Sequence, residues 1–249
     1  MSAHIKITRD DAVVEVVIAR PEKKNALTAD MYDAMIAALD EAEADAAIGA
    51  VVVAGEGGAF TAGNDIADFL ATTKDMNDFG GLRFVRRIAT FDKPLVAAVD
   101  GVAVGVGTTM LFHCDLVYAS PGAQFRMPFV DLALVPEAAA SLLVPRRVGV
   151  ARATELLMLA EPFDAARAEA LGIVNAVIPS NELLAHARRK AAALAGKPRE
   201  ALLATRRLIR GDRAEIVARI DAEARVFGER MASAEARAVF TAFMCRGKT

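Results

Sequence analysis

Short runs of β-branched residues alternate with longer segments of helical periodicity over the first part of this chain. Residues 5–19, IKITRDDAVVEVVIA, predict a hairpin with Asp10 and Asp11 at the turn and period-two alternation in the second arm. Four further strands are predicted in GAVVVAGEGG (49–58), PLVAAVDG (94–101), DLVYAS (115–120) and AQFRMP (123–128).

Helical segments separate these strands. Thr28 is a good N-cap for a helix that continues to about Ala46, with Met31 and Leu39 on its buried side. The segment TTMLFHC (108–114) predicts a buried helix, which places His113 in the core. Strands separated by helices favour crossover connections, so we expect an α/β fold with a largely parallel sheet.

The composition changes after about residue 180. Residues 181–244 are rich in Ala, Arg, Glu and Leu and predict three or four helices, with breaks near Gly196–Pro198 and Gly211–Asp212. We therefore expect a core over residues 1–180 and a helical region over residues 181–249. So many alanines on helices also favour self-association.

Composition and charge narrow the functional classes. A net charge of −2 gives no basic field for nucleic acid or an anionic membrane. No apolar run is long enough to span a bilayer and the N-terminus has no apolar signal core, so we expect a cytoplasmic protein. Two cysteines and three scattered histidines have no ligand-type spacing, and we expect no metal site.

Two glycine-bearing turns follow predicted strands and lead into predicted helices. The first, Ala62-Gly63-Asn64-Asp65, and the second, Gly105-Val106-Gly107, each expose backbone N–H groups near a helix start. Such groups can bind a developing negative oxygen. The alternatives are a tight turn with a left-handed Asn64 and an Asp65 N-cap, and glycines that allow close backbone packing.

Glu137 is the candidate for proton transfer. It is a lone carboxylate in the apolar run LALVPEAAASLLVP, whose flanks contain no cationic partner. Burial there would raise its pKa towards the range where a carboxyl serves first as base and then as acid. The alternative is a solvent-facing glutamate at a helix start.

Several ordered motifs resemble the enoyl-CoA hydratase/isomerase (crotonase) family over nearly the whole chain. They are RPEKKNALT (20–28), GAFTAGNDI (58–66), KPLVAAVDGVAVGVG (93–107), CDLVYAS (114–120) and the helical tail. The resemblance implies a crotonase (ClpP-like) spiral of ββα units with a C-terminal helical trimerisation region. It also implies an acyl-CoA thioester as partner, a homotrimer or a hexamer formed as a dimer of trimers, and no cofactor beyond the coenzyme A of the substrate.

The same resemblance implies roles for individual residues. The oxyanion-hole N–H groups would belong to Asn64 and Val106. The coenzyme would lie along Lys24, Ala26, Leu27, Ala62, Asn64, Asp65 and Ile66. The acyl chain length would depend on residues 67–92.

Departures from the family pattern bear on the reaction. Hydratases of this family use two glutamates, and Thr109 and Phe129 occupy those positions here. Glu137 is similar to the single glutamate of the Δ3,Δ2-enoyl-CoA isomerase branch. The favoured hypothesis is therefore an isomerase that converts 3-enoyl-CoA to 2-enoyl-CoA. The alternatives are an enoyl-CoA hydratase, another acyl-CoA reaction through the same enolate, and a catalytically silent acyl-CoA-binding or RNA-binding member.

Overall fold

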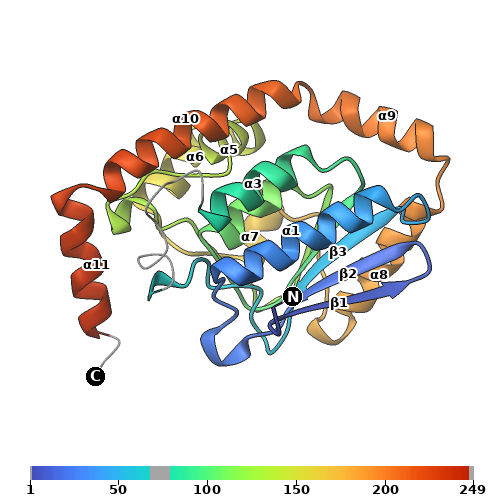
Figure 1. Cartoon of the computed structure of the whole chain (residues 1–249), viewed down its shortest axis with the longest axis horizontal. Coiled ribbons are helices and arrows are strands. Elements are labelled where there is room, and N and C mark those ends of the chain that lie inside the picture. The colour runs from blue at the N-terminus through green and yellow to red at the C-terminus, as the bar shows by residue number, and fades with distance from the viewer. Residues whose placement is uncertain (1, 68–78, 247–249) are drawn as a thin grey trace.

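The computed structural model of the protein describes residues 2–67 and 79–246, with side chains as far as residue 242. An α/β body is covered by helices on both faces, and helices from the C-terminal part of the chain extend along its upper edge (Figure 1).

A six-stranded sheet forms the centre, in the order β1-β2-β3-β4-β6-β9. Its strands are β1 Ile5–Asp10, β2 Val13–Ile18, β3 Ala50–Gly55, β4 Leu95–Val99, β6 Leu116–Ala119 and β9 Ala176–Val177. Only the β1–β2 pair is antiparallel, and each later pair is parallel. The expected strands and the largely parallel sheet are confirmed.

The first hairpin differs in detail from the expectation. Asp10 ends β1, and the turn consists of Asp11 and Ala12, with Asp11 in the left-handed region at φ 48°. The predicted alternation in the second arm is wrong, because β2 lies between two strands and is buried on both faces. Even Glu15 is buried there, and it is paired with Arg188 at 2.6 Å.

A second sheet of three short strands carries one of the glycine turns. It contains β5 Val102–Val104, β7 Gln124–Arg126 and β8 Phe163–Asp164, in the order β5-β7-β8. The sequence predicted β7 but assigned residues 102–104 to a glycine-rich turn. They form a strand because their backbone pairs with β7 on one side and with Thr61 on the other.

Helices cover the two faces of the central sheet. On one face α1 (Ala29–Ala44) and α3 (Gly80–Thr90) pack together, and Thr28 has the extended backbone expected of an N-cap. On the other face α8 (Ser180–Ala195) buries Leu183, Ala187 and Ala191 against β3 and β4. The predicted buried helix at 108–114 corresponds to α4 (Val106–Thr109) and the 3-10 turn η3 (Met110–His113).

The described part of the C-terminal region, up to residue 246, contains four helices with the expected breaks. They are α8, α9 (Arg199–Arg210), α10 (Arg213–Met231) and α11 (Ala234–Arg246). The α10 helix packs against α3 and against α5 (Ala140–Val148), so the C-terminal region lies over the body. The division at residue 180 stays a prediction.

The remaining elements are short and connect these layers. They are η1 (Pro21–Lys23), η4 (Val130–Leu132), α6 (Val150–Thr154), the π-helical turn η5 (Glu155–Leu159) and α7 (Ala165–Ala170).

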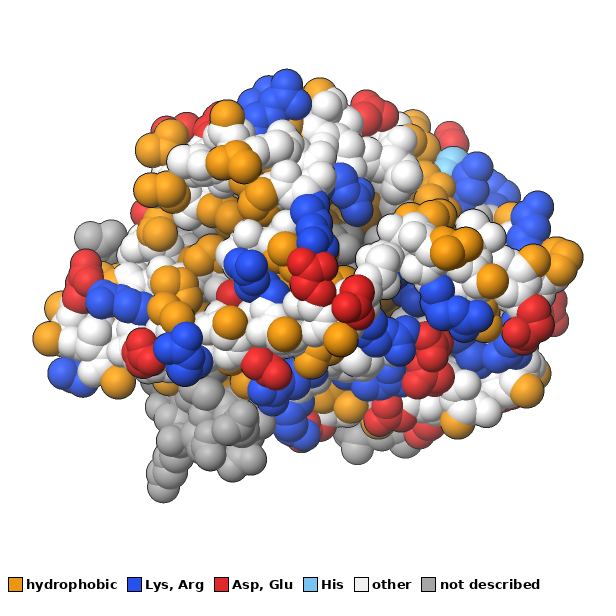
Figure 2. Space-filling view, turned by 90° about the horizontal axis from the view of Figure 1, so that it is seen from above, with side chains coloured by type: hydrophobic (Ala, Val, Ile, Leu, Met, Phe, Trp, Pro, Cys, Tyr) orange, Lys and Arg blue, Asp and Glu red, His pale blue; other side chains and the backbone are white. Residues whose placement is uncertain are grey.

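The surface charges and the hydropathy of the helices match two features of the sequence, the small net charge and the lack of long apolar runs. Basic and acidic side chains are intermixed on the face that α10 covers (Figure 2). Within the described ranges, no helix is both long and apolar enough to cross a bilayer.

Gly101 is a point where the fold requires glycine. Its φ is +64°, and a Cβ there would lie 1.9 Å from the carbonyl oxygen of Gly58. We predict that Gly101→Ala strongly lowers the urea midpoint of unfolding, because both the backbone conformation and the space exclude a side chain.

Gly172→Ala is the matched control. Gly172 also has a positive φ, of +70°, but a Cβ there would meet no atom within 4 Å. The Gly172→Ala substitution should lower the free energy of unfolding only by the cost of placing a residue with a Cβ at positive φ, about 1–2 kcal/mol. Equal losses in the two variants would contradict the steric account.

Candidate active site

The two glycine turns predicted from the sequence lie against each other. The backbone of Thr61 pairs with Ala103, and the N–H of Val104 donates to the Thr61 carbonyl oxygen at 3.0 Å. A Cβ on Gly63 would lie 2.7 Å from the Val104 oxygen, and a Cβ on Gly107 would lie 2.6 Å from Cγ2 of Thr61. Glycine at both positions therefore permits this close approach.

The N–H groups of Asn64 and Val106 are available to a ligand. Gly105 has φ 57° and precedes α4, so that Val106 is the first residue of that helix. Within residues 2–67 and 79–246, neither N–H donates a hydrogen bond. The side chain of Asn64 is held separately, because its Oδ1 accepts from the Tyr32 hydroxyl at 2.5 Å. Asn64 does not have the left-handed φ of the alternative interpretation; Gly63 has it instead, at 87°.

Glu137 shares one small, mostly apolar cavity with Asn64 and Val106. The other residues that line this cavity are Tyr32, Phe79, Gly81, Leu82, Val85, Ala138, Ile220, Ala224 and Phe227. The three residues predicted from separate motifs are thus brought together by the fold. The alternative of a solvent-facing Glu137 does not match this placement.

Burial governs the ionisation of Glu137. Loss of solvent around the carboxyl raises its pKa to about 8, and the charge of Glu223 adds to the rise. The hydroxyl of Thr109 donates a short hydrogen bond to Oε1 of Glu137, which partly offsets this effect. A carboxyl with such a pKa can take a proton and return it near neutral pH.

The two positions that carry glutamate in hydratases are buried here. Thr109 is fully buried, and Phe129 is only 6% exposed. Thr109 can donate to Glu137 but has no carboxylate, and Phe129 has no polar side-chain atom. The contact between Thr109 and Glu137 joins residues far apart in the chain and was not predicted from the sequence.

The segment predicted to bind coenzyme runs beside the first glycine turn. The N–H of Ala62 donates to the Lys24 carbonyl oxygen at 2.9 Å, and Leu27 exchanges 2.8 Å hydrogen bonds with Gly63 and Asp65. Leu27 is only 1% exposed, so only its backbone could face a ligand, whereas Lys24 is exposed and Ala26, Ala62 and Ile66 are partly exposed.

An ion pair and a buried amide hold this segment in place. Asp65 pairs with Arg20 at 2.8 Å and also accepts from the N–H of Ala67, as the N-cap interpretation expected. Asn25 is fully buried, and its side-chain amide donates to the carbonyl oxygens of Glu56 and Ala59 at 2.9 and 2.6 Å. The family resemblance alone did not predict these two anchors.

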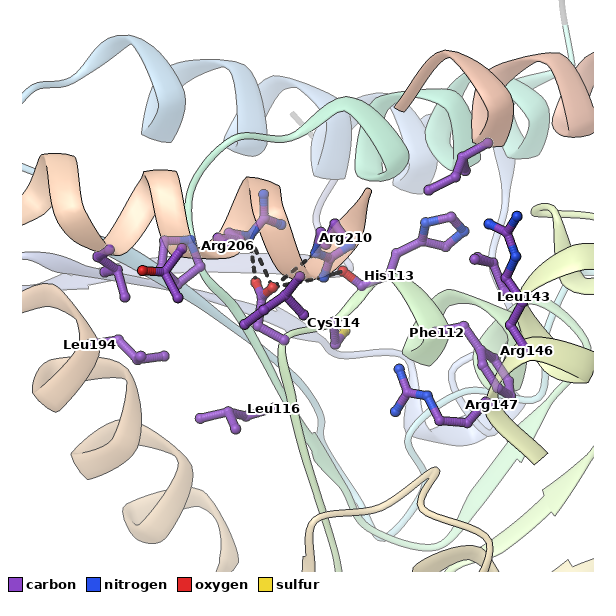
Figure 3. Close-up of a pocket in the computed structure, with 16 residues that line it drawn as sticks. Phe112, His113, Cys114, Leu116, Leu143, Arg146, Arg147, Leu194, Arg206 and Arg210 are labelled. Atoms are coloured by element: carbon purple, nitrogen blue, oxygen red, sulfur yellow. Dashed lines mark hydrogen bonds and ion pairs between the residues drawn. The ribbon is translucent and has the colours of Figure 1, made fainter. Parts of the chain in front are cut away.

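A larger cavity of about 470 Å³ lies elsewhere, between α9 and η3 (Figure 3). Its guanidinium groups at Arg206 and Arg210 are paired with Asp115 at 2.9 Å. His113 lines it and is buried, with a pKa lowered by burial to about 4. This cavity contains none of the predicted site residues, and the core placement of His113 and Cys114 is confirmed.

Glu56 and Asp92 form ion pairs with Lys6 and Arg213 at the surface. Residues 68–78, part of the segment on which the acyl chain length was expected to depend, lie outside the described residues. No group of three or more His, Cys, Asp or Glu suited to a metal ion occurs among the residues that the structure describes.

The chain is similar to known proteins over most of its length. Residues 8–249 match the family described as Enoyl-CoA hydratase/isomerase. Human Enoyl-CoA delta isomerase 2 is 34% identical over 224 residues, which cover 87% of this chain and 57% of that protein. The chain thus spans little more than half the length of this relative. Short-chain-enoyl-CoA hydratase from Clostridium acetobutylicum is 30% identical over 254 residues and is covered to 96%.

A solved structure supports the fold assignment as well. The enoyl-CoA hydratase/isomerase from Pseudoalteromonas atlantica T6c superposes with a TM-score of 0.92 at 38% identity, covering 98% of this chain and 97% of that one. The expected crotonase fold is therefore confirmed, and the chain belongs to the enoyl-CoA hydratase/isomerase family.

Proposed function

We propose that this protein isomerises 3-enoyl-CoA thioesters to 2-enoyl-CoA thioesters, with Glu137 as the only proton carrier. The observation that carries the proposal is the position of Glu137, a half-buried residue whose desolvated carboxyl has a raised pKa, in the same cavity as two backbone N–H groups that donate no hydrogen bond among the described residues. The similarity to delta isomerases supports it.

The proposed reaction moves one proton within the substrate. The carboxylate of Glu137 removes a proton from C2, and the electron pair spreads over a dienolate. The N–H groups of Asn64 and Val106 hold the thioester oxygen, where each donor would lower the barrier by about 3 kcal/mol. The protonated Glu137 then returns the proton to C4, so that the double bond moves from C3–C4 to C2–C3.

Coenzyme A enters this proposal only as part of the substrate. We place it along the segment that holds Lys24 and Ala26 and along the first glycine turn, where backbone groups and the exposed Lys24 are accessible. The acyl chain would lie towards the apolar lining of α3 and α10, which includes Leu82, Val85 and Phe227.

Substitution of Glu137 tests the role of the carboxyl. Glu137→Gln should lower kcat on 3-enoyl-CoA by at least about 100-fold, because an amide cannot take the C2 proton. The KM should change little, since the thioester contacts are made by backbone groups. Thr109→Val is a companion variant that removes the hydrogen bond but keeps the base, so it should retain much more activity. Near-normal turnover by Glu137→Gln would exclude Glu137 as the base.

The pH profile tests the environment of the carboxyl. The kcat/KM for 3-enoyl-CoA should rise with pH through a midpoint near 8, because burial raises the pKa of Glu137 to that value and only the ionised form is a base. A rate that is constant across neutral and mildly alkaline pH would show that no such group controls the reaction.

Hydration of 2-enoyl-CoA is the second candidate function. It is favoured by the Clostridium acetobutylicum hydratase, which aligns with almost the entire chain. Thr109 and Phe129 argue against hydration. Water addition needs an acid and a base, and neither of these side chains has a carboxyl group. Incubation with a panel of 2- and 3-enoyl-CoAs separates these functions: a 3-hydroxyacyl product indicates a hydratase, and binding without any product indicates a silent member.

We also propose that the protein assembles as a homotrimer or as a dimer of trimers. The supporting observation is α9, where Leu208 and Ile209 are 85% and 80% exposed. Apolar side chains this exposed are typical of contact surfaces when they lie together.

Light scattering tests the assembly. The native protein should have a mass three or six times the 26.3 kDa of one chain. Leu208→Glu combined with Ile209→Glu should shift it towards the monomer, while Ile7→Glu on the edge strand β1 should not. A monomeric native protein would contradict the proposal.

A further inference from the structure

A further carboxyl that takes no part in the proposed mechanism, that of Glu223, is buried on the apolar face of α10. Ile216, Ile220 and Phe227 occupy that face at helical spacing and are at most 6% exposed. Glu223 lies in the same stripe and is 7% exposed. A carboxylate in such a position is costly unless it is bonded, so a specific role is expected.

Glu223 binds the first turn of α5. Its Oε1 accepts from the N–H of Ser141 at 2.8 Å and from the Ser141 hydroxyl at 2.5 Å. A carboxylate at this place satisfies a free N–H at the helix start and interacts favourably with the helix dipole. Its Oε2 is buried and has no hydrogen-bond partner among the described residues.

The segment that Glu223 holds is the one that carries Glu137. Ala138 and Ala139, which follow Glu137, have φ 60° and 56°, and Ala139 is the N-cap of α5. Left-handed backbone costs about 1–2 kcal/mol for each residue that has a Cβ, so surrounding contacts must hold this turn. On one side, Nε2–H of His113 donates a hydrogen bond to the Ala138 carbonyl oxygen at 2.8 Å. On the other side, Glu223 accepts a hydrogen bond from the N–H of Ser141.

We propose that Glu223 is a positioning residue for the reaction: it fixes the start of α5, and through it the left-handed turn, so that the Glu137 carboxyl stays aimed into the cavity. This inference rests on the proposed function. It also gives α10 a direct part in the site, beyond the apolar residues that it contributes to the lining.

Because Glu223 is charged, it has a second effect on Glu137 that an uncharged hydrogen-bond acceptor would not have. Its negative charge raises the pKa of Glu137, in addition to the larger effect of burial.

The other titratable groups around the turn are Tyr32 from α1, whose hydroxyl donates to Asn64, and His113 from η3, which is neutral because burial lowers its pKa. From α10, Arg219 donates to the Ser141 hydroxyl at 3.3 Å and favours the charged form of Glu223. The α3 residues that line the cavity are uncharged.

Two substitutions separate the effect of the Glu223 hydrogen bond to Ser141 from the effect of the Glu223 charge. Glu223→Gln keeps an oxygen that can accept from Ser141 but removes the charge, so the midpoint of the pH profile should fall by at least about 0.5 unit. Glu223→Ala removes the acceptor as well, so kcat should fall by about 10-fold or more while KM stays within about twofold. Glu229→Gln, at an exposed carboxylate on the same helix, is the control and should match the native enzyme.

The titration of Glu137 can also be followed without substrate. Carbon-13 NMR of glutamate-labelled protein, with Glu137→Gln used for assignment, reports this carboxyl directly. An unchanged Glu137 titration in folded Glu223→Gln, together with native kcat in Glu223→Ala, would overturn the proposal. If Glu223→Ala does not fold, Glu223→Asp, whose shorter side chain draws the carboxylate away from Ser141, replaces it in the kcat comparison. Failure of the proposed function would appear differently, as a native enzyme that is inactive on 3-enoyl-CoA while Glu223 still shifts the Glu137 titration.

Discussion

The burial of one carboxyl without a cationic partner is the constraint on which the site depends. Solvent around an ionised carboxylate is worth many kcal/mol, and the apolar residues around Glu137 do not replace it with opposite charge. The protein instead supplies one hydroxyl donor, from Thr109, and tolerates a raised pKa of about 8. A carboxyl with this pKa can take a proton and return it near neutral pH, which suits a reaction that ends with the carboxylate in its starting form.

The backbone around this carboxyl is shaped by left-handed residues. Gly63 and Gly105 adopt positive φ in the two turns that present free N–H groups, and glycine does so without a Cβ penalty. Behind Glu137 the same conformation falls on Ala138 and Ala139, which do carry that penalty. The two glycine turns therefore adopt their conformation because of the glycines themselves. The turn at Ala138 and Ala139 must instead be held by contacts with His113 and Glu223.

The sequence predicted the elements with strong local signals. The β-branched run at 50–55 and the breaks at Gly196 and Gly211 have a direct physical cause in neighbouring residues. The helix after Thr28 starts where expected, although the Thr28 side chain makes no capping hydrogen bond. Glu137 was found because its apolar flanks predicted burial. The two glycine turns were found because they follow strands, and the family resemblance then implied the N–H groups of Asn64 and Val106. The β5 strand was missed because its partners, Thr61 and β7, are distant in the sequence.

The supporting residues were beyond the reach of local patterns for the same reason. Alanine favours right-handed helix, so nothing in PEAAAS indicated two left-handed residues. Glu223 approaches Ser141 only because α10 folds back over α3 and α5, although a glutamate in an apolar stripe of that helix was an available signal. The family resemblance likewise identified the reacting groups but not Arg20, Asn25 or Tyr32, which hold them.

The most direct measurement follows a deuterium label placed at C2 of a 3-enoyl-CoA during turnover in ordinary water. If a single buried carboxyl takes the C2 hydron and returns it before exchange with solvent, part of the product should carry the label at C4 and none should carry oxygen at C3. A product hydroxylated at C3, or a 2-enoyl-CoA in which the deuterium abstracted from C2 is lost without any transfer to C4, would contradict the account.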